Sequence, residues 1–282
     1  MSDMVSAWGG ELDPPECFLR VEVNALNYCA YDLALGDAHA LEGWLAVPNT
    51  LESAWIDIYA LPERRRVAEA VGKQGVLGRG LERPPIVMAL QLVLENERLQ
   101  LVAGYEDGSI QSWSMEAATG MLKPELSWSH RPHTESVMAL ALAPSRDTVV
   151  SVGADQLLAQ TQLYTDTPPH TTKLPRPGNA CVAVRQDARV LAIGGWDGAV
   201  RVFSKHMALL ATLAYHKEGV SSVAYVRSEP TYTLAVPEAE SDEEDISRLP
   251  RHRLAAGAKD GRVSLWDVPF TRDDVMPQLR AP

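Results

Sequence analysis

Apolar and polar residues alternate along much of this chain in short segments that recur at intervals. Each segment starts with small apolar residues, continues through a turn that contains Asp, and ends in a second alternating stretch. The turn residue and the residue six places after it are Asp107 and Trp113, Asp197 and Phe203, Asp260 and Trp266, and, in a weaker copy, Asp155 and Thr161. Alternation with a period of two predicts β-strands, and the Asp-Gly pairs in three of the copies favour tight hairpin turns.

A further apolar run precedes each turn. These runs are residues 86–94, 137–142, 180–184 and 220–226. The interval from Asp107 to Asp155 is 48 residues, the next to Asp197 is 42, and the last to Asp260 is 63. Four-stranded units with a repeat of roughly 40–45 residues are typical of β-propeller blades. The pattern therefore predicts an all-β propeller whose last blade carries an insertion.

The region before the first clear repeat predicts a divergent blade. Its expected strands are residues 23–29, 44–48 and 54–61, with Ser53 and Tyr59 at the positions that later copies give to Asp and an aromatic residue. The predicted organisation is a disordered N-terminus at 1–16, a propeller at 17–270 with blades at about 17–70, 84–125, 133–175, 178–212 and 213–268, and a C-terminal tail at 271–282.

The insertion in the last blade is strongly acidic. His133 precedes Asp155 by 22 residues, whereas His216 precedes Asp260 by 44, so the extra residues fall at about 227–251. The acidic core of this loop is Ser241, Asp242, Glu243, Glu244 and Asp245. Such a composition does not pack into a core, so the stretch is expected to be a disordered surface loop. It is either a solvated spacer or a site where an acid-directed kinase modifies Ser241.

Two histidines extend the pattern, because each lies four residues before an apolar run: His133 before Val137, and His216 before Val220. This layout resembles the WD-repeat family, in which a histidine, the turn Asp and a strand Trp share a buried hydrogen-bond network. The resemblance implies structural blade residues at His133, His216, Asp107, Asp197, Asp260, Trp113, Phe203 and Trp266. The family's strand Ser or Thr is replaced here by Ala256 or Ala258, so the network of the last blade is expected to be incomplete.

Four longer segments narrow the resemblance. Residues 101–109, 195–197 with 201–203, 213–216 and 254–260 together resemble the ASTRA-associated family, also described as G-protein-β-subunit-like proteins. The resemblance implies a non-catalytic scaffold in a nuclear assembly of phosphatidylinositol-3-kinase-related (PIKK) proteins and co-chaperones that acts in chromatin regulation, with a possible cytoplasmic pool. Alternatives are a substrate receptor of a cullin-type ubiquitin ligase and another WD-repeat adaptor.

The blade count leaves two arrangements open. Members of that family have seven blades, and this chain supplies five. The five recognisable four-stranded blades therefore form either an incomplete seven-bladed ring in a chain that lacks the first two blades, or a closed five-bladed ring. In the closed ring, residues 17–21 would pair with the strand at 263–268.

Composition disfavours other classes of function. The formal net charge of −11 argues against direct nucleic-acid binding, and no apolar stretch approaches the ~20 residues of a membrane helix. Three widely spaced cysteines argue against a disulfide framework or a zinc site. No catalytic or cofactor motif is present, so no enzyme activity, cofactor or small-molecule substrate is expected. His216 with Asp260 could form half of a catalytic constellation, but a structural role is the favoured interpretation.

Overall fold

All regular structure among the described residues of the computed structural model is β-structure. The described residues are 20–23, 29–37, 42–73, 84–117, 120–226 and 253–268. Within them, nineteen strands form five antiparallel sheets, four with four strands and one with three. The all-β prediction is confirmed.

The sheets follow the chain in order. The first contains β1 (Asp32–Asp37), β2 (Glu42–Pro48), β3 (Ile56–Leu61) and β4 (Arg65–Val71), and the second β5 (Val87–Glu95), β6 (Arg98–Tyr105), β7 (Ile110–Glu116) and β8 (Glu125–His130). The third contains β9 (Val137–Leu142), β10 (Thr148–Gly153), β11 (Leu157–Gln162) and β12 (His170–Lys173). The fourth contains β13 (Asn179–Val184), β14 (Val190–Gly195), β15 (Ala199–Ser204) and β16 (Leu209–Ala214). The fifth contains β17 (Val220–Tyr225), β18 (Arg253–Ala258) and β19 (Val263–Asp267).

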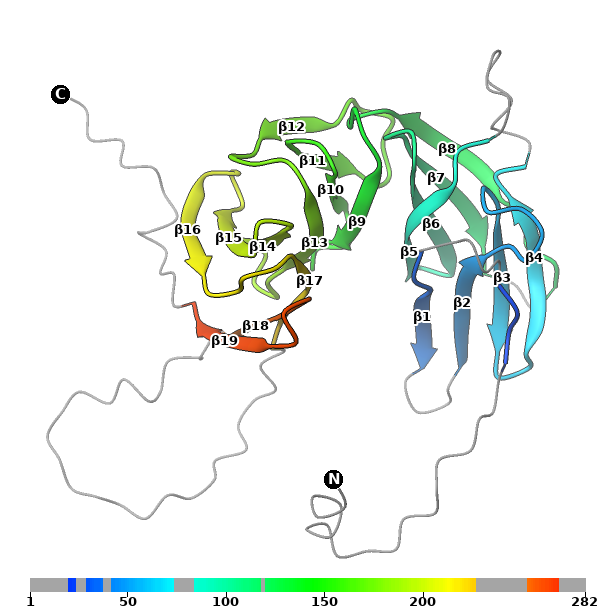
Figure 1. Cartoon of the computed structure of the whole chain (residues 1–282). Coiled ribbons are helices and arrows are strands. Elements are labelled where there is room, and N and C mark those ends of the chain that lie inside the picture. The colour runs from blue at the N-terminus through cyan, green and yellow to red at the C-terminus, as the bar shows by residue number, and fades with distance from the viewer. Residues whose placement is uncertain are drawn as a thin grey trace, which may run out of the picture.

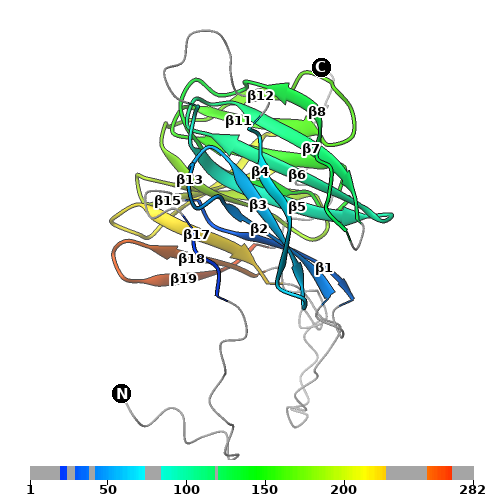
Figure 2. The ribbon, with the colours of Figure 1, turned by 90° about the vertical axis from the view of Figure 1, so that its right-hand side faces the viewer.

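Each sheet is a simple meander, and we call the sheets the first to fifth blades. The first strands of successive blades lie next to one another, β1 by β5, β5 by β9, β9 by β13 and β13 by β17. The remaining strands of each blade extend outward from this inner row (Figure 1). Figure 2 shows the blades from the side, packed one over the next. This radial order of sheets defines a β-propeller.

The described blades form an open arc. In Figure 1 the first and fifth blades lie at its two ends with a gap between them, and β19 pairs with β18 alone among the described strands. The closed ring would need residues 17–21 to pair with 263–268. Instead, the described residues 20–23 lie at the first blade, where Thr50 Oγ1 donates a hydrogen bond of 2.9 Å to the carbonyl of Glu22. Residues 20–23 therefore do not pair with β19, and residues 17–19 lie outside the described part of the chain.

The inner strand of the first blade differs from the prediction. The inner strand of the described first blade is β1, which the sequence did not predict, and the strand predicted at residues 23–29 falls mostly on residues 24–28, outside the described set. The position of β1 depends on the second blade: the Asp32 carboxylate accepts hydrogen bonds from the Leu92 backbone NH at 2.5 Å and from Gln91 Nε2 at 2.7 Å. These partners are about sixty residues away in the chain, so local alternation could not reveal them.

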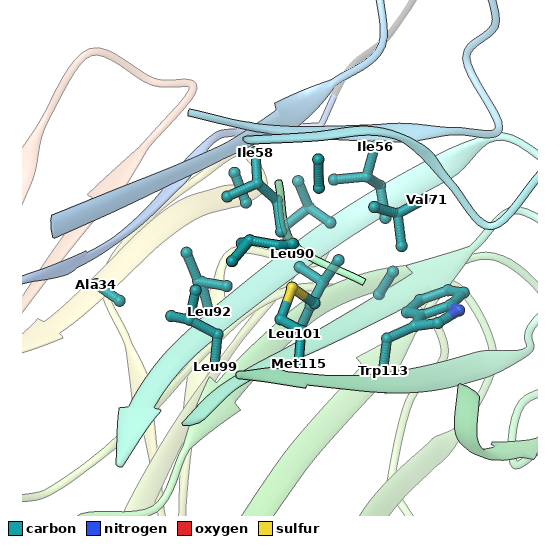
Figure 3. Close-up of a cluster of buried hydrophobic side chains, with 14 of the residues drawn as sticks. Ala34, Ile56, Ile58, Val71, Leu90, Leu92, Leu99, Leu101, Trp113 and Met115 are labelled. Atoms are coloured by element: carbon teal, nitrogen blue, oxygen red, sulfur yellow. The ribbon is translucent and has the colours of Figure 1, made fainter. Parts of the chain in front are cut away.

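Apolar side chains between neighbouring blades form the core. Ile56, Ile58 and Val71 of the first blade face side chains of the second blade such as Leu90 and Trp113 (Figure 3). Similar clusters lie between the later blades. Burial of apolar surface stabilises such contacts by about 25 cal/mol per Å². The packed blades form a rigid body, in which the turns at one end of the strands share a common surface.

Candidate functional site

Two of the three Asp-Gly turns pack against the histidine loops of the following blades. Gly108 and Gly198 have positive φ values of 86° and 79°. A Cβ atom on Gly108 would lie 2.3 Å from the carbonyl oxygen of His133, and one on Gly198 would lie 2.5 Å from that of His216. Only glycine satisfies both the left-handed backbone and this close approach. Each turn therefore positions a histidine of the next blade.

In the third blade, His133 is the centre of a buried network. His133 Nδ1 lies 3.1 Å from Asp155 Oδ1, and His133 Nε2 lies 2.9 Å from Ser151 Oγ. A carboxylate only accepts hydrogen bonds, so Nδ1 carries the proton, and Nε2 accepts from the Ser151 hydroxyl. Asp155 also accepts from the backbone NH groups of Thr134 at 2.8 Å and Leu157 at 2.9 Å. The network thus joins the loop before β9 to the turn between β10 and β11.

In the fifth blade, His216 is the centre of a similar network that also includes a tryptophan. His216 Nδ1 lies 3.2 Å from Asp260, and His216 Nε2 lies 2.9 Å from Ser264 Oγ. Trp266 Nε1 donates to the same Ser264 oxygen at 2.8 Å. The sequence placed His216, Asp260 and Trp266 in one network, and the structure brings them together. The expectation that Ala256 leaves this network without a hydroxyl is wrong, because Ser264 supplies it.

The serine occupies opposite strands in the two networks. Ser151 lies four residues before its Asp and pairs across the strands with Ala159. Ser264 lies four residues after its Asp and pairs with Ala256. Cross-strand partners have Cβ atoms about 5 Å apart on one face of the sheet, so either position can present a hydroxyl to the histidine. The signal in the sequence was a serine four places after Asp260, which is informative only once the strand pairing is considered.

The other two turn aspartates lie outside any histidine network. Asp107 accepts hydrogen bonds from the backbone NH of Ser109 at 3.0 Å and from its hydroxyl at 2.5 Å. Asp197 accepts from the Arg201 guanidinium at 2.5 and 3.1 Å. This pairing, opposed by partial burial, holds the pKa of Asp197 below its usual value. These two residues stabilise their own turns.

The predicted aromatic residues of the second and fourth blades are buried. Trp113 lies in the cluster between the first and second blades, with its ring edge-on to Tyr105 at a centroid distance of 6.5 Å. Phe203 lies in the cluster between the third and fourth blades. Thr161 takes the equivalent position in the third blade, where its hydroxyl is buried and has no hydrogen-bond partner. The aromatic positions therefore serve blade packing.

Both networks have the Ser-His-Asp connectivity of a hydrolase triad, but both serines are buried. Ser151 is 1% exposed and His133 2%, so a substrate cannot reach this hydroxyl in the folded chain. Desolvation lowers the pKa of His133, although Asp155 acts against the shift, so the ring is held neutral. In the fifth blade the Ser264 oxygen already accepts from Trp266. The networks hold the blades together.

The described segments give little support for a metal site or a reactive cysteine. No three His, Cys, Asp or Glu side chains gather there as a metal site would need. Burial raises the pKa of the Cys29 thiol to about 12 and that of Cys181 to about 11, so both are protonated at neutral pH. Residues 241–245 lie outside the described residues, and modification of Ser241 stays a prediction.

Over the segments that the structure describes, there is no helix with the length and apolar character needed to traverse a membrane.

Blades of this topology, with histidine–aspartate–serine networks that join successive turns, define a WD-repeat protein. In agreement, the family model described as "WD domain, G-beta repeat" matches residues 207–267. These residues contain the complete network of the fifth blade.

Two relatives specify the family further. The chain is 32% identical to ASTRA-associated protein 1 of Verticillium alfalfae, over 88% of this chain and 66% of that protein. It is 31% identical to guanine nucleotide-binding protein subunit beta-like protein 1 of Mus musculus, again over 88% of this chain and 66% of the relative. The chain belongs to this family of WD-repeat proteins, and it spans about two thirds of the length of these two relatives.

A solved structure supports the fold independently. The chain is similar to a crystal structure of the computationally designed Ika8 protein, with a TM-score of 0.54 and 17% sequence identity. The match covers 83% of this chain and 57% of the designed one. At this identity the similarity shows a shared fold alone.

Proposed function

We propose that this chain is a non-catalytic scaffold subunit of an ASTRA-type nuclear complex, where it links PIKK proteins and co-chaperones to chromatin remodelling. The observation that carries the proposal is the 32% identity, over most of the chain, to a protein named ASTRA-associated protein 1. The whole-complex role rests on that family relation.

The architecture supports a scaffold role. Rigid blades hold many short loops at the two ends of the strands, and binding residues gather on such loops. The Ser-His-Asp constellations, which could otherwise indicate an enzyme, are buried within blades. Protein partners are therefore the expected ligands, and a nuclear location, with a cytoplasmic pool, belongs to the same proposal.

Affinity purification of the tagged full chain, followed by mass spectrometry, tests the proposal. Recovery of PIKK proteins with their co-chaperones is the expected result. Recovery of a cullin and its adaptor in their place, or of no stable partner, would overturn it. Phosphopeptide mapping of the same material tests the separate prediction at Ser241, which fails if the residue is never modified.

A further inference from the structure

An exposed tryptophan marks one corner of the fourth and fifth blades. Trp196 lies at the turn between β14 and β15 and is 52% exposed. Its backbone NH donates to the carbonyl of Gly178 at 2.7 Å, and a Cβ atom on Gly178 would lie 2.5 Å from Trp196 Cε3. The indole therefore rests on the glycine backbone while about half of its surface meets solvent. Tryptophan is enriched in protein interfaces relative to the rest of the protein surface.

Three turns meet at this corner. A Cβ atom on Gly219 would lie 3.3 Å from the Trp196 Cα, and Gly219 O accepts from the Lys259 backbone NH at 3.0 Å. Tyr215, on the same loop as Gly219, is 49% exposed and stands edge-on to His216 at a centroid distance of 5.1 Å. Two half-exposed aromatic side chains thus lie on contiguous turns.

The charge of this corner opposes that of the whole chain. Asp197 is paired with Arg201, whereas Asp260 is held by a hydrogen bond from His216 and keeps its charge, so Asp260 and Glu218 are the remaining acidic residues of these turns. The exposed basic residues on them and on the adjoining loop are Arg176, Lys217, Lys259 and Arg262. A chain of net charge −11 therefore carries a locally basic surface around Trp196. We call these four residues with Trp196 and Tyr215 the Trp196 surface.

We propose that the Trp196 surface binds an acidic peptide segment of a partner protein, with an aromatic or aliphatic side chain among its carboxylates. Tryptophan and tyrosine are frequent hot spots of interfaces, and surrounding charges steer and orient the partner. A protein partner accords with the proposed scaffold function, so an acidic peptide is favoured over a nucleic-acid phosphate backbone. The inference deepens the proposed scaffold function and rests on it.

Fluorescence anisotropy with the full chain tests this binding. The probe is a fluorescein-labelled twelve-residue peptide of Glu and Asp around one Phe and one Leu. Trp196→Ala should weaken its binding about tenfold or more, in the range of an interface hot spot. The double substitution Lys217→Glu with Lys259→Glu should weaken it similarly, and added salt should weaken binding to the wild type.

Matched controls separate the surface from general effects. Leu51→Ala removes a side chain that is 84% exposed on the first blade, and Arg189→Glu reverses an exposed charge at the other end of the fourth blade. Both should leave peptide binding unchanged. Because Trp196→Ala could loosen the turn on Gly178, the charge reversals provide an independent test, and each variant's unfolding midpoint is recorded.

Three results would overturn the proposal. The first is equal binding of a peptide with Gln and Asn in place of Glu and Asp. The second is an equal loss of affinity in Arg189→Glu. The third is tighter binding of a labelled twenty-nucleotide DNA strand that is lost through the same substitutions, which would make the surface a nucleic-acid site.

The purification experiment distinguishes this inference from the scaffold function. Loss of an identified partner from Trp196→Ala and from the double reversal, but not from Arg189→Glu, supports the surface. Retention of all partners by those variants overturns the surface and leaves the scaffold function intact. If the wild-type chain recovers no partner, the scaffold function itself is wrong.

Discussion

The third and fifth blades contain the same histidine-centred network in two constructions. In the third blade the serine precedes the turn and the aromatic position holds Thr161, and the network is enclosed between two neighbouring blades. In the fifth blade the serine follows the turn and also accepts from Trp266, at the end of the described arc. In both blades a serine hydroxyl lies 2.9 Å from the histidine Nε2, although different strands supply the serine.

The largest expected difference in stability between the two blades is seen when their network aspartates are replaced. Asp155→Ala removes the acceptor of a buried histidine and two backbone NH groups, so we expect a loss of about 3–4 kcal/mol in unfolding free energy. Asp260→Ala should cost less, because the backbone NH groups that it leaves behind belong to the exposed residues Lys217 and Arg262. Urea denaturation of both variants measures this. Equal losses would show that enclosure between blades does not matter.

The two serine substitutions should reduce stability in the opposite order, with the larger loss in the fifth blade. Ser264→Ala leaves both His216 Nε2 and Trp266 Nε1 without a partner, so we expect a loss of about 2 kcal/mol, against about 1 kcal/mol for Ser151→Ala. Ala256→Ser added to Ser264→Ala should recover much of the loss, because the two positions face each other across the strands. No recovery would mean that the two strand positions are not interchangeable.

A pH titration should show how much His133 of the third blade contributes to the free energy of unfolding. Desolvation lowers the pKa of His133 in the folded chain, so the unfolded chain binds more protons near and below its ordinary pKa of about 6.5. Stability from this residue is present above that pH and is lost as pH falls, by about 1.4 kcal/mol for each pKa unit of depression. Unfolding free energies of the wild type and His133→Gln, measured from pH 7.5 to 5, should converge toward low pH. Parallel curves would contradict the assignment.

The smallest effect is expected where the third blade lacks its tryptophan. The Thr161 hydroxyl is buried without a partner, so Thr161→Val should be neutral or stabilise the chain by up to about 1 kcal/mol. A thermal melt beside Ser151→Ala checks the sign. A clear loss of stability would show that this hydroxyl takes part in the network.

Sequence patterns located most inner strands closely. The apolar run at 137–142 is β9, and the run at 220–226 contains β17. The pattern failed at the first blade, where β1 starts with Asp32, whose partners are in the second blade. The pattern failed again at Ser264, because alternation alone predicts that a serine on a strand faces solvent, and only the partner strand shows otherwise.

The sequence alone determined the repeat, the all-β class and the turns, and its resemblance to WD repeats implied the histidine–aspartate partners. The first three features rest on local alternation, on glycine at left-handed positions and on a recurring interval. Tertiary structure alone decided the open arc of described blades, the supply of a hydroxyl from Ser264, and the basic corner around Trp196. Each of these depends on which strands and loops meet in space. Residues 44 or more positions apart, such as His216 and Asp260, become partners only when the sheet between them is complete.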